Sequence, residues 1–277
     1  MARTWLITGV SAGLGRALAK AALAQGDVVA GTVRNDAAGA AFEALGPGRA
    51  HAVLMDVTDA AAVLCAVADV EERLGVIDVV VNNAGYGLVG AVEEASFEEV
   101  RAQFETNVFG PLAVLKAVLP AMRARRGGTV VNVTSVSGLA TWAGTGVYCA
   151  SKFALTALTQ TLAAELAELG VTVINAAPGG MRTDFAGRSQ HVVAEKFADY
   201  DGLARDAERI LADHAGQEPG DPDRMAAAIL KAVESEKPPL HLLLGEDALK
   251  YAGYGRDALW ADVEAWRETT LSTAFED

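Results

Sequence analysis

Short apolar runs rich in β-branched residues alternate along the chain with longer, alanine-rich amphipathic stretches. The short runs have strand length and predict seven strands, over Trp5–Thr8, Asp27–Val33, Ala50–Asp56, Asp78–Val81, Thr129–Thr134, Val171–Ala176 and Leu240–Leu244. The longer stretches predict helices over Leu14–Gln25, Ala60–Leu74, Phe97–Arg125 (as two helices), Lys152–Leu169 and Asp223–Glu234. This alternation predicts an α/β fold with a doubly wound, seven-stranded parallel sheet between two helical layers, which is the three-layer Rossmann architecture.

One segment interrupts the alternation. From Phe185 to Pro222 the chain is polar and charged, and it closes on the turn-rich residues Glu218–Pro222. We interpret residues 185–222, approximately, as a lid-like insertion in a single domain that spans residues 1–277. The last stretch, Glu246–Asp277, carries tryptophans with a helical spacing of acids, and is compatible either with a cover over the active site or with a contact to another subunit.

Charge and composition narrow the classes of function. The net charge is -13 at pH 7, so the overall field repels phosphate backbones and anionic membranes, and we expect neither nucleic acid nor membrane as a partner. No apolar run approaches the ~18 residues that a membrane-spanning helix needs, and no secretion signal is visible. Cys65 and Cys149 form no Cys-x-x-Cys pair and the four histidines lack ligand spacing, so no metal site is expected. A cytoplasmic protein is the expectation.

The turn after the first predicted strand is rich in glycine. Thr8–Arg16 has glycines at positions 9, 13 and 15 and opens directly into a predicted helix. Glycine permits a tight turn and lets backbone amides approach a pyrophosphate, whose charge then lies at the positive end of the helix. The alternative is an ordinary strand-to-helix turn, which the strand before it and the helix after it make less favoured. The turn therefore predicts a dinucleotide site.

The end of the second predicted strand bears on the choice of dinucleotide. A chain that binds NAD would carry an acid there, about 20 residues beyond the turn, for the ribose 2′-hydroxyl. That position is Val33, and it is followed by Arg34, which can bind a 2′-phosphate; Arg16 could reach the same group. We expect NADP(H). Asp36 keeps NAD(H) as the less favoured alternative, and Arg34 as a merely solvated residue is another.

A serine, a tyrosine and a lysine form a candidate catalytic set. Tyr148 and Lys152 share a face if both lie on one helix, and Ser135 lies thirteen residues before the tyrosine, at the carboxyl end of a predicted strand. A tyrosine titrates near pH ~10, so it is a poor base at neutral pH unless an ammonium such as that of Lys152 stabilises its phenolate. Ser135 can donate a hydrogen bond to a substrate oxygen. The Tyr-Lys pair alone would by default be a helix surface, whereas the combination with the serine and the glycine turn predicts proton transfer.

In order and spacing these residues are similar to the classical short-chain dehydrogenase/reductases, which the chain resembles over nearly its whole length. The resemblance rests on Thr8–Gly15, Asn82–Gly85, Asn107, Ser135, Tyr148–Lys152 and Pro178–Gly179. Two phrases, Asn83–Gly87 and Thr106–Gly110, look like a bacterial group often labelled hydroxysteroid-dehydrogenase-like, a label that is no proof of a steroid substrate.

The resemblance implies an oxidoreductase that transfers hydride between NADP(H) and a carbonyl or secondary alcohol. It implies that Tyr148 is the general acid/base and that Lys152 lowers its pKa and binds the nicotinamide ribose. Ser135 would orient the substrate oxygen and Asn107 would support a proton-relay water. The implied cofactor-binding residues are Gly9, Ser11, Gly13, Leu14, Gly15, Arg34, Asp56, Val57, Asn83, Ala84, Gly85, Tyr148, Lys152, Pro178, Gly179, Met181 and Thr183.

Within that set, the resemblance implies that Asp56 meets the adenine amino group and that Asn83–Gly85 line the adenine-ribose side. Thr183 would bond the carboxamide. A departure from the family pattern is Gly180, where a bulkier residue is frequent, and this puts the local backbone contact with the cofactor in doubt.

An apolar ketone, aldehyde or alcohol is the expected substrate. Leu139 and Trp142 are placed to contact it, with ordinary packing as the equal alternative for each. We expect a homodimer or homotetramer, because the helix predicted from Lys152 has more apolar surface than one sheet face needs, at Leu155, Leu158, Leu162 and Leu166; in the resembling family this helix forms the main subunit interface. The alternative functions are a nucleotide sensor or scaffold without turnover, and an epimerase or dehydratase on a related frame.

Overall fold

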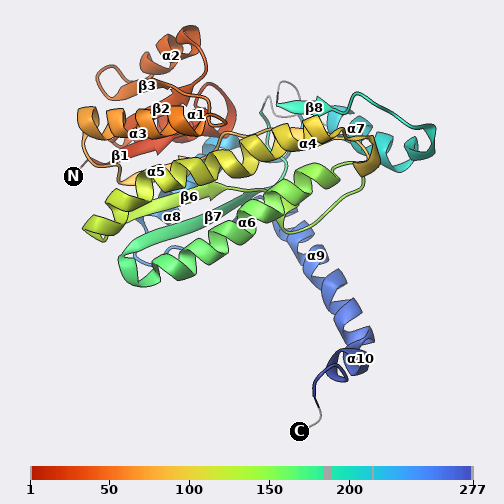
Figure 1. The fold of residues 1–277 in the computed structure, drawn as a ribbon. Coiled ribbons are helices and arrows are strands. Elements are labelled where there is room, and N and C mark those ends of the chain that lie inside the picture. Colours follow the sequence, from red (N-terminus) through yellow and green to blue (C-terminus); the bar gives the residue numbers. More distant parts are fainter. Residues whose placement is uncertain (1, 184–188, 214, 276–277) are drawn as a thin grey trace.

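Seven parallel strands form the centre of the molecule, in the order β3-β2-β1-β4-β6-β7-β9 (Figure 1). This computed structural model describes residues 2–183, 189–213 and 215–275. The strands are β1 Thr4–Ile7, β2 Val28–Val33, β3 Ala50–Leu54, β4 Val79–Asn82, β6 Gly128–Val133, β7 Val171–Pro178 and β9 His241–Leu244. All seven predicted strands are confirmed. Because β1 pairs with both β2 and β4, the strand order reverses at its carboxyl end, which is where open α/β sheets bind ligands.

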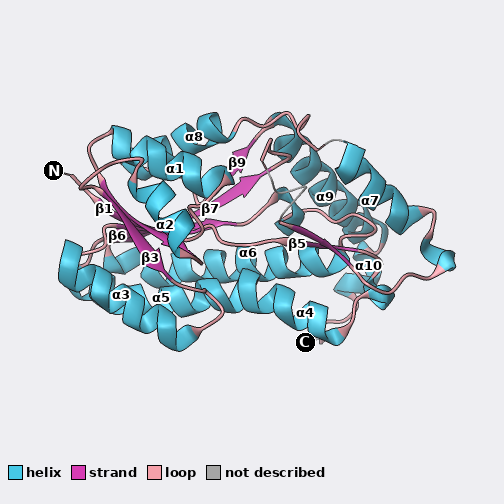
Figure 2. Cartoon of the chain, turned by 90° about the horizontal axis from the view of Figure 1, so that it is seen from above, coloured by secondary structure: helices cyan, strands magenta, loops and turns pink. Residues whose placement is uncertain are grey.

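Helices cover both faces of this sheet (Figure 2). One layer contains α1 Gly13–Ala24 and α8 Pro222–Glu234; the other contains α3 Ala60–Leu74, α5 Gly110–Arg125 and α6 Gly146–Leu166. Leu18 of α1 and Ile229 of α8 are fully buried in one apolar core with Trp5, while Val63 of α3 and Met122 of α5 are fully buried in the other. The sheet is therefore buried on both faces, and the predicted three-layer architecture is confirmed.

A helix that the sequence patterns do not predict follows β2. This helix, α2 (Asp36–Glu43), is only eight residues long and contains a glycine, so its periodicity is weak. Its first turn is capped by the side chain of Asn35, which accepts a hydrogen bond from the amide of Ala38 at 2.9 Å. Phe42 anchors it: this ring is fully buried, and a Cβ at Gly31 of β2 would lie 2.5 Å from it. The packing of the Phe42 ring against β2 therefore determines that α2 forms here.

The two helices predicted within Phe97–Arg125 are present, as α4 (Phe97–Phe104) and α5, and a π-helical turn over Glu105–Phe109 joins them. The helix predicted from Lys152 needs a correction, because α6 already begins at Gly146. In the six residues before Lys152 the buried positions are Val147, Cys149 and Ser151, and this alternation hides the helical period of 3.6 residues. The earlier start places Tyr148 on the helix itself.

Residues 185–222, the segment interpreted above as an insertion and called the insertion below, contain regular structure that the sequence patterns do not predict. Its described part holds β8 (Gln190–Val192), a 3-10 turn and α7 (Leu203–Asp213), whereas residues 184–188 and 214 lie outside the described residues. Strand β8 pairs in parallel with β5 (Gly87–Val89) in a separate two-stranded sheet. The insertion is thus joined to the chain directly after β4.

The C-terminal stretch forms α9 (Glu246–Ala265) and α10 (Arg267–Leu271), which lead away from the sheet (Figure 1). As far as its midpoint α9 packs closely, since a Cβ at Gly255 would lie 2.5 Å from the carbonyl oxygen of Leu139. Further on, large apolar side chains stay exposed, among them Leu259, Trp260, Trp266 and Leu271. The first part of α9 therefore lies against the loop after Ser135, and the rest contacts little of its own chain.

Candidate active site

The turn between β1 and α1 requires its glycines. Gly9 and Gly13 have φ angles of 73° and 56°, a backbone region that favours glycine. A Cβ at Gly15 would lie 2.4 Å from the carbonyl oxygen of Gly9, so no side chain fits there. No side chain caps α1, which leaves its first amides for another acceptor. Leu14 is buried in the core, so only its backbone can face a ligand.

Two side chains, Thr8 of the turn and Asn83 directly after β4, tie the turn to the end of β4. The hydroxyl of Thr8 accepts hydrogen bonds from the amides of Asn83 and Ala84, each at 2.9 Å. The Asn83 side chain donates in return to the carbonyl oxygens of Thr8 at 2.8 Å and Gly9 at 3.2 Å. Asn83 therefore acts on the shape of the glycine turn, a role that its sequence position did not suggest.

A pocket of about 350 Å³ opens beside the turn. Its lining includes Ser11 and Gly13 of the turn, Thr183, and three basic side chains, those of Arg16, Lys20 and Arg182. An anion in this pocket would meet positive charge and backbone amides together. Arg16 thus shares a pocket with Thr183, on the side of α1 that faces the start of α8.

The end of β2 carries the residues that bear on the ribose. Arg34 is exposed, while Val33 before it is buried. The pKa of Asp56, just after β3, is lowered chiefly by a hydrogen bond from the Thr58 amide, with burial acting against this and the Arg34 charge acting for it. The charge of Arg34 thus acts on Asp56 in the same direction as the Thr58 hydrogen bond. Asp36, the alternative ribose-reading acid, is exposed in the first turn of α2.

Ser135, Tyr148 and Lys152 meet at the carboxyl end of β6. Ser135 follows that strand, and its side chain hydrogen-bonds to Tyr148. Lys152 is buried; its Nζ lies 5.9 Å from the centre of the Tyr148 ring and donates to the carbonyl oxygen of Val133 at 3.0 Å. The structure thus brings Ser135, at the end of a strand, next to the Tyr148–Lys152 pair, which helix spacing alone had placed on one face.

Asn107 is held beside them by the π-helical turn. Its side-chain amide donates to the carbonyl oxygen of Tyr86 at 3.0 Å and to the hydroxyl of Ser151 at 3.1 Å, and its oxygen accepts from the Tyr86 amide at 3.2 Å. A Cβ at Gly85 would lie 2.9 Å from Asn107 Oδ1 and 3.7 Å from Lys152 Nζ. Asn107 and Lys152 therefore border the same glycine, where a larger residue would fill the space.

Burial shifts the pKa of both Tyr148 and Lys152. It raises the pKa of Tyr148 to about 12, with the hydrogen bond from Ser135 acting against it. It lowers the pKa of Lys152 to about 8. At neutral pH the protein thus presents a neutral phenol beside a buried ammonium that is close to losing its proton.

The segment after β7 completes the site. A Cβ at Gly179 would lie 2.3 Å from the Asp247 carboxylate, and the amide of Gly180 donates to that carboxylate at 2.6 Å. The acid Asp247, at the start of α9, thus holds the backbone at both glycines. Met181 forms a bridge to Gly220.

Thr183 lies against the glycine turn, because a Cβ at Gly13 would lie 3.6 Å from its side chain. This position joins the end of the β7 segment to the pocket beside α1. The other implied cofactor residues, Pro178 at the end of β7 and Val57 after β3, are both buried. Thr183 and its neighbour Arg182 therefore both border the pocket beside the glycine turn.

The sequence matches a known family over most of this frame. The model described as short chain dehydrogenase matches residues 3–193, from β1 through the glycine turn, Ser135, Tyr148 and Lys152 to β8. The chain belongs to the short-chain dehydrogenase family.

Similar dehydrogenases extend the match beyond residue 193. Oxidoreductase BOA17 of Botryotinia fuckeliana is 39% identical over 277 residues, which cover 99% of this chain and 100% of that protein. A solved short-chain dehydrogenase from Streptomyces avermitilis is 41% identical with a TM-score of 0.93, covering 99% of this chain and 98% of its own. An alcohol dehydrogenase from Thermococcus sibiricus, solved with 5-hydroxy-NADP, is 26% identical with a TM-score of 0.71, covering 88% and 96%.

Aromatic side chains connect this dehydrogenase's Ser135–Tyr148 loop to α9. Trp142 packs edge-on against Tyr251 of α9 at 5.3 Å between ring centres, and Tyr251 packs against Tyr254 at 6.2 Å. Cys149 is buried and lies 3.3 Å from the Thr145 hydroxyl, as a packed thiol would. The start of α9 thus supplies part of the wall beside the candidate active site.

The described part of this dehydrogenase holds neither a helix suited to spanning a membrane nor a side-chain cluster suited to binding a metal. Within residues 2–183, 189–213 and 215–275, no helix is both long and apolar enough to cross a membrane. The same residues contain no group of three or more histidine, cysteine or acidic side chains that could hold a metal ion.

Proposed function

We propose that this dehydrogenase is a cytoplasmic, NADP(H)-dependent enzyme that interconverts a carbonyl compound and a secondary alcohol, with Tyr148 as general acid/base. The observation that carries the proposal is the meeting of Ser135, Tyr148 and Lys152 at the carboxyl end of β6. A sensor or scaffold without turnover would have no need to bury a lysine next to a tyrosine, because a buried cation lowers stability.

The residues present fit a dinucleotide. The glycine turn leaves no room for side chains at Gly15, and α1 presents uncapped amides beside a pocket with three basic side chains. Asp56 stays ionised and can accept from an adenine amino group. Lys152 Nζ, bordering Gly85, is placed to donate to a ribose hydroxyl.

Side chains of this protein would transfer the proton that accompanies the hydride. When bound, the nicotinamide supplies or accepts the hydride. In reduction, the neutral phenol of Tyr148 donates its proton to the carbonyl oxygen, which Ser135 orients by a hydrogen bond. In oxidation, the Lys152 ammonium stabilises the phenolate that must accept the proton. Asn107 holds the Tyr86 backbone and Ser151 beside this set and would support a water that relays the proton.

Removal of one hydroxyl tests the proposal. Tyr148→Phe should abolish NADPH oxidation across a panel of ketones and aldehydes while NADPH affinity, measured by fluorescence titration, stays nearly intact. Tyr254→Phe is the matched control, since it removes the same hydroxyl from an exposed ring. Appreciable activity in Tyr148→Phe would move the acid/base role to another group.

For cofactor choice, we propose a preference for NADPH, with Arg34 binding the 2′-phosphate. Solved relatives hold NADP or a derivative in some cases and NAD in another, so family likeness does not decide. A charge-assisted bond to phosphate contributes about 1.5–3 kcal/mol, or roughly ten- to a hundredfold in binding. Arg34→Ala should abolish most of this preference for NADPH over NADH. Arg73→Ala, which removes an exposed arginine of α3, should leave the preference unchanged. An unchanged NADPH-to-NADH ratio of kcat/KM in Arg34→Ala would assign the ribose to Asp36 or its loop.

We propose an apolar carbonyl compound or alcohol as substrate, in a pocket bordered by Leu139, Trp142 and the insertion acting as a lid. The aromatic contacts of Trp142 with α9 support an apolar wall. The likeness of two phrases to the bacterial hydroxysteroid-dehydrogenase-like group stays a prediction, since the similar proteins include fungal oxidoreductases and retinol dehydrogenases. We further propose that residues 1–277 form one domain.

A homodimer or homotetramer stays our proposal for the assembly, on revised grounds. Leu155 and Leu166 of α6 are buried in the chain's own packing, so they are not available to a second subunit. Phe153 and Leu158 of α6 are exposed, and so are the apolar side chains of the outer part of α9 and α10. Light scattering that gives the mass of a single chain at micromolar concentration would reject the proposal.

A further inference from the structure

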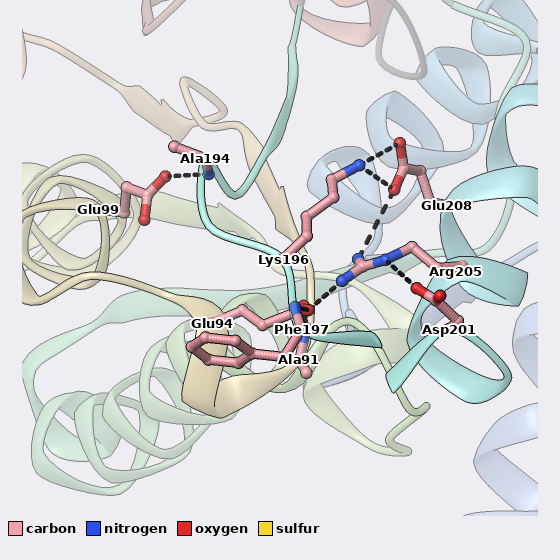
Figure 3. Close-up of polar contacts among 9 residues, drawn as sticks. All are labelled: Ala91, Glu94, Glu99, Ala194, Lys196, Phe197, Asp201, Arg205 and Glu208. Atoms are coloured by element: carbon pink, nitrogen blue, oxygen red, sulfur yellow. Dashed lines mark hydrogen bonds and ion pairs between the residues drawn. The ribbon is translucent and has the colours of Figure 1, made fainter. Parts of the chain in front are cut away.

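A carboxylate is buried outside the candidate active site. Glu94 ends a 3-10 turn after β5, and its side chain is 0% exposed. One oxygen accepts from the amide of Ala91 at 2.9 Å; the other accepts from the amide of Phe197 at 2.8 Å and from the guanidinium of Arg205 (Figure 3). Burial alone would raise the pKa of Glu94, but these amides and the Arg205 charge outweigh it and lower that pKa. Glu94 is therefore a charged, fully paired group.

Its distant partners all come from the insertion. Arg205 of α7 is 17% exposed, and Asp201 and Glu208 lie 3.7 Å and 3.8 Å from it as ion-pair neighbours. Nε and Nη1 of Arg205 are buried and make no hydrogen bond to the described residues. Glu94 is thus the group from outside the insertion that neutralises this cation, and without it Arg205 would keep only charges of its own segment.

The segment that this pair holds contacts the frame of the active site. Val193, which follows β8, packs with Leu88 and Val147, the neighbour of Tyr148 in sequence. Gly144, in the loop between Ser135 and Tyr148, lies under α7: a Cβ there would be 2.8 Å from the Cβ of Ala207. The position of α7 therefore limits the shape of that loop.

Other attachments of the insertion also hold it, among them the Tyr200 hydroxyl, which donates to Glu93 at 2.5 Å. Its strand β8 pairs with β5 over three residues, and the amide of Ala194 donates to Glu99 at 3.1 Å (Figure 3). On α7, Ala204 is buried, whereas Ile210 is 51% exposed. Among the side chains of α7 that the structure describes, few apolar ones are fully buried, so the polar anchor adds to a limited packing surface.

We infer that Glu94 and Arg205 form a latch that holds α7 against the Gly144 loop and thereby sets the affinity for substrate. Both are positioning residues, since neither touches the reacting groups. The link to substrate affinity rests on the proposed function, whereas the latch itself does not.

Glu94→Gln tests the latch, because the amide keeps the size of the side chain but loses the charge and one acceptor. We expect the α7 amides to exchange with solvent at least about tenfold faster, measured by hydrogen–deuterium exchange without substrate or cofactor. Glu98→Gln is the matched control: it removes the same charge from an exposed side chain that lies 3.8 Å from Arg101, and should change nothing. Unchanged exchange in α7 of Glu94→Gln would overturn the latch, whatever the outcome for Tyr148.

Kinetics test the consequence. For a ketone or aldehyde that the wild type reduces, Glu94→Gln should raise KM about tenfold and leave kcat and the Kd for NADPH within about twofold. A general loss of structure would change all three together. Faster exchange in α7 with an unchanged KM would overturn the role in substrate affinity.

Arg205→Met keeps the inference testable if Glu94→Gln folds poorly, and a double variant tests whether the two residues act as one unit. Arg205→Met alone should also loosen α7, and Glu94→Gln with Arg205→Met removes both buried charges. We expect the double variant to exchange no faster than either single variant, because the two residues act as one unit. Additive effects of the two substitutions would show that they act separately and would overturn the pair.

Discussion

The buried lysine of the candidate active site should lower the stability of the fold. Burial lowers the pKa of Lys152 from its usual 10.5 to about 8. Such a drop costs roughly 3 kcal/mol, at about 1.4 kcal/mol for each tenfold loss of proton affinity. Lys152→Met removes the charge and keeps a linear side chain, but it also loses the hydrogen bond to Val133, worth about 1 kcal/mol. We therefore expect Lys152→Met to be more stable than the wild type by roughly 2 kcal/mol near pH 7 while it loses activity.

The pH dependence separates this charge effect from a change in packing. Between pH 8 and 10.5, approximately, the unfolded chain keeps the Lys152 proton and the folded chain releases it, so the wild type gains stability as the pH rises through this window. Below the window the folded wild type bears the full cost of the buried ammonium. The advantage of Lys152→Met should accordingly be largest near pH 7 and shrink towards pH 10.5.

Urea unfolding followed by tryptophan fluorescence, at about pH 7, 8.5 and 10, measures the difference in the free energy of unfolding. Lys116→Met, which removes an exposed lysine from α5, is the control and should show no such trend. The reasoning fails if Lys152→Met is less stable than the wild type near pH 7, or if the difference between the two proteins is the same at every pH.

Three further substitutions probe the site and the fold. Gly15→Ala should abolish NADPH binding in a calorimetric titration, since its Cβ would lie 2.4 Å from the Gly9 carbonyl oxygen, and binding within twofold of the wild type would contradict the tight turn. Asp247→Ala should weaken NADPH binding about tenfold, because the amide of Gly180 loses a charged acceptor at 2.6 Å; an unchanged Kd would show that this segment does not depend on the acid. Phe42→Ala should lower the free energy of unfolding by about 3–5 kcal/mol, because the ring is fully buried, and a loss below about 1 kcal/mol in urea would mean that α2 is not docked by it.

Much of the fold and part of the candidate site follow from local patterns. The seven strands of the central sheet are visible as short β-branched runs, because strands buried on both faces need apolar residues at every position. The glycines at 9, 13 and 15 indicate a tight turn, because each requirement is a property of the backbone near that glycine. Tyr148 and Lys152 are one helical turn apart, so their shared face is a matter of helix geometry.

Contacts between distant segments were decided only by the tertiary structure. Asp247 reaches Gly180 across 67 positions, and Glu94 reaches Arg205 across 111, and no local pattern marks either acid among the 36 in the chain. Helix α2 forms because the Phe42 ring packs on Gly31 of β2, where there is no side chain, and this contact depends on how the two elements pack. The lowered pKa of Lys152 likewise comes from burial, and burial cannot be inferred from the identity of the residue. The sequence thus determined which chemical groups are present and their local geometry, and the tertiary structure decided which of them are desolvated and paired, because burial and long-range contact depend on the whole fold.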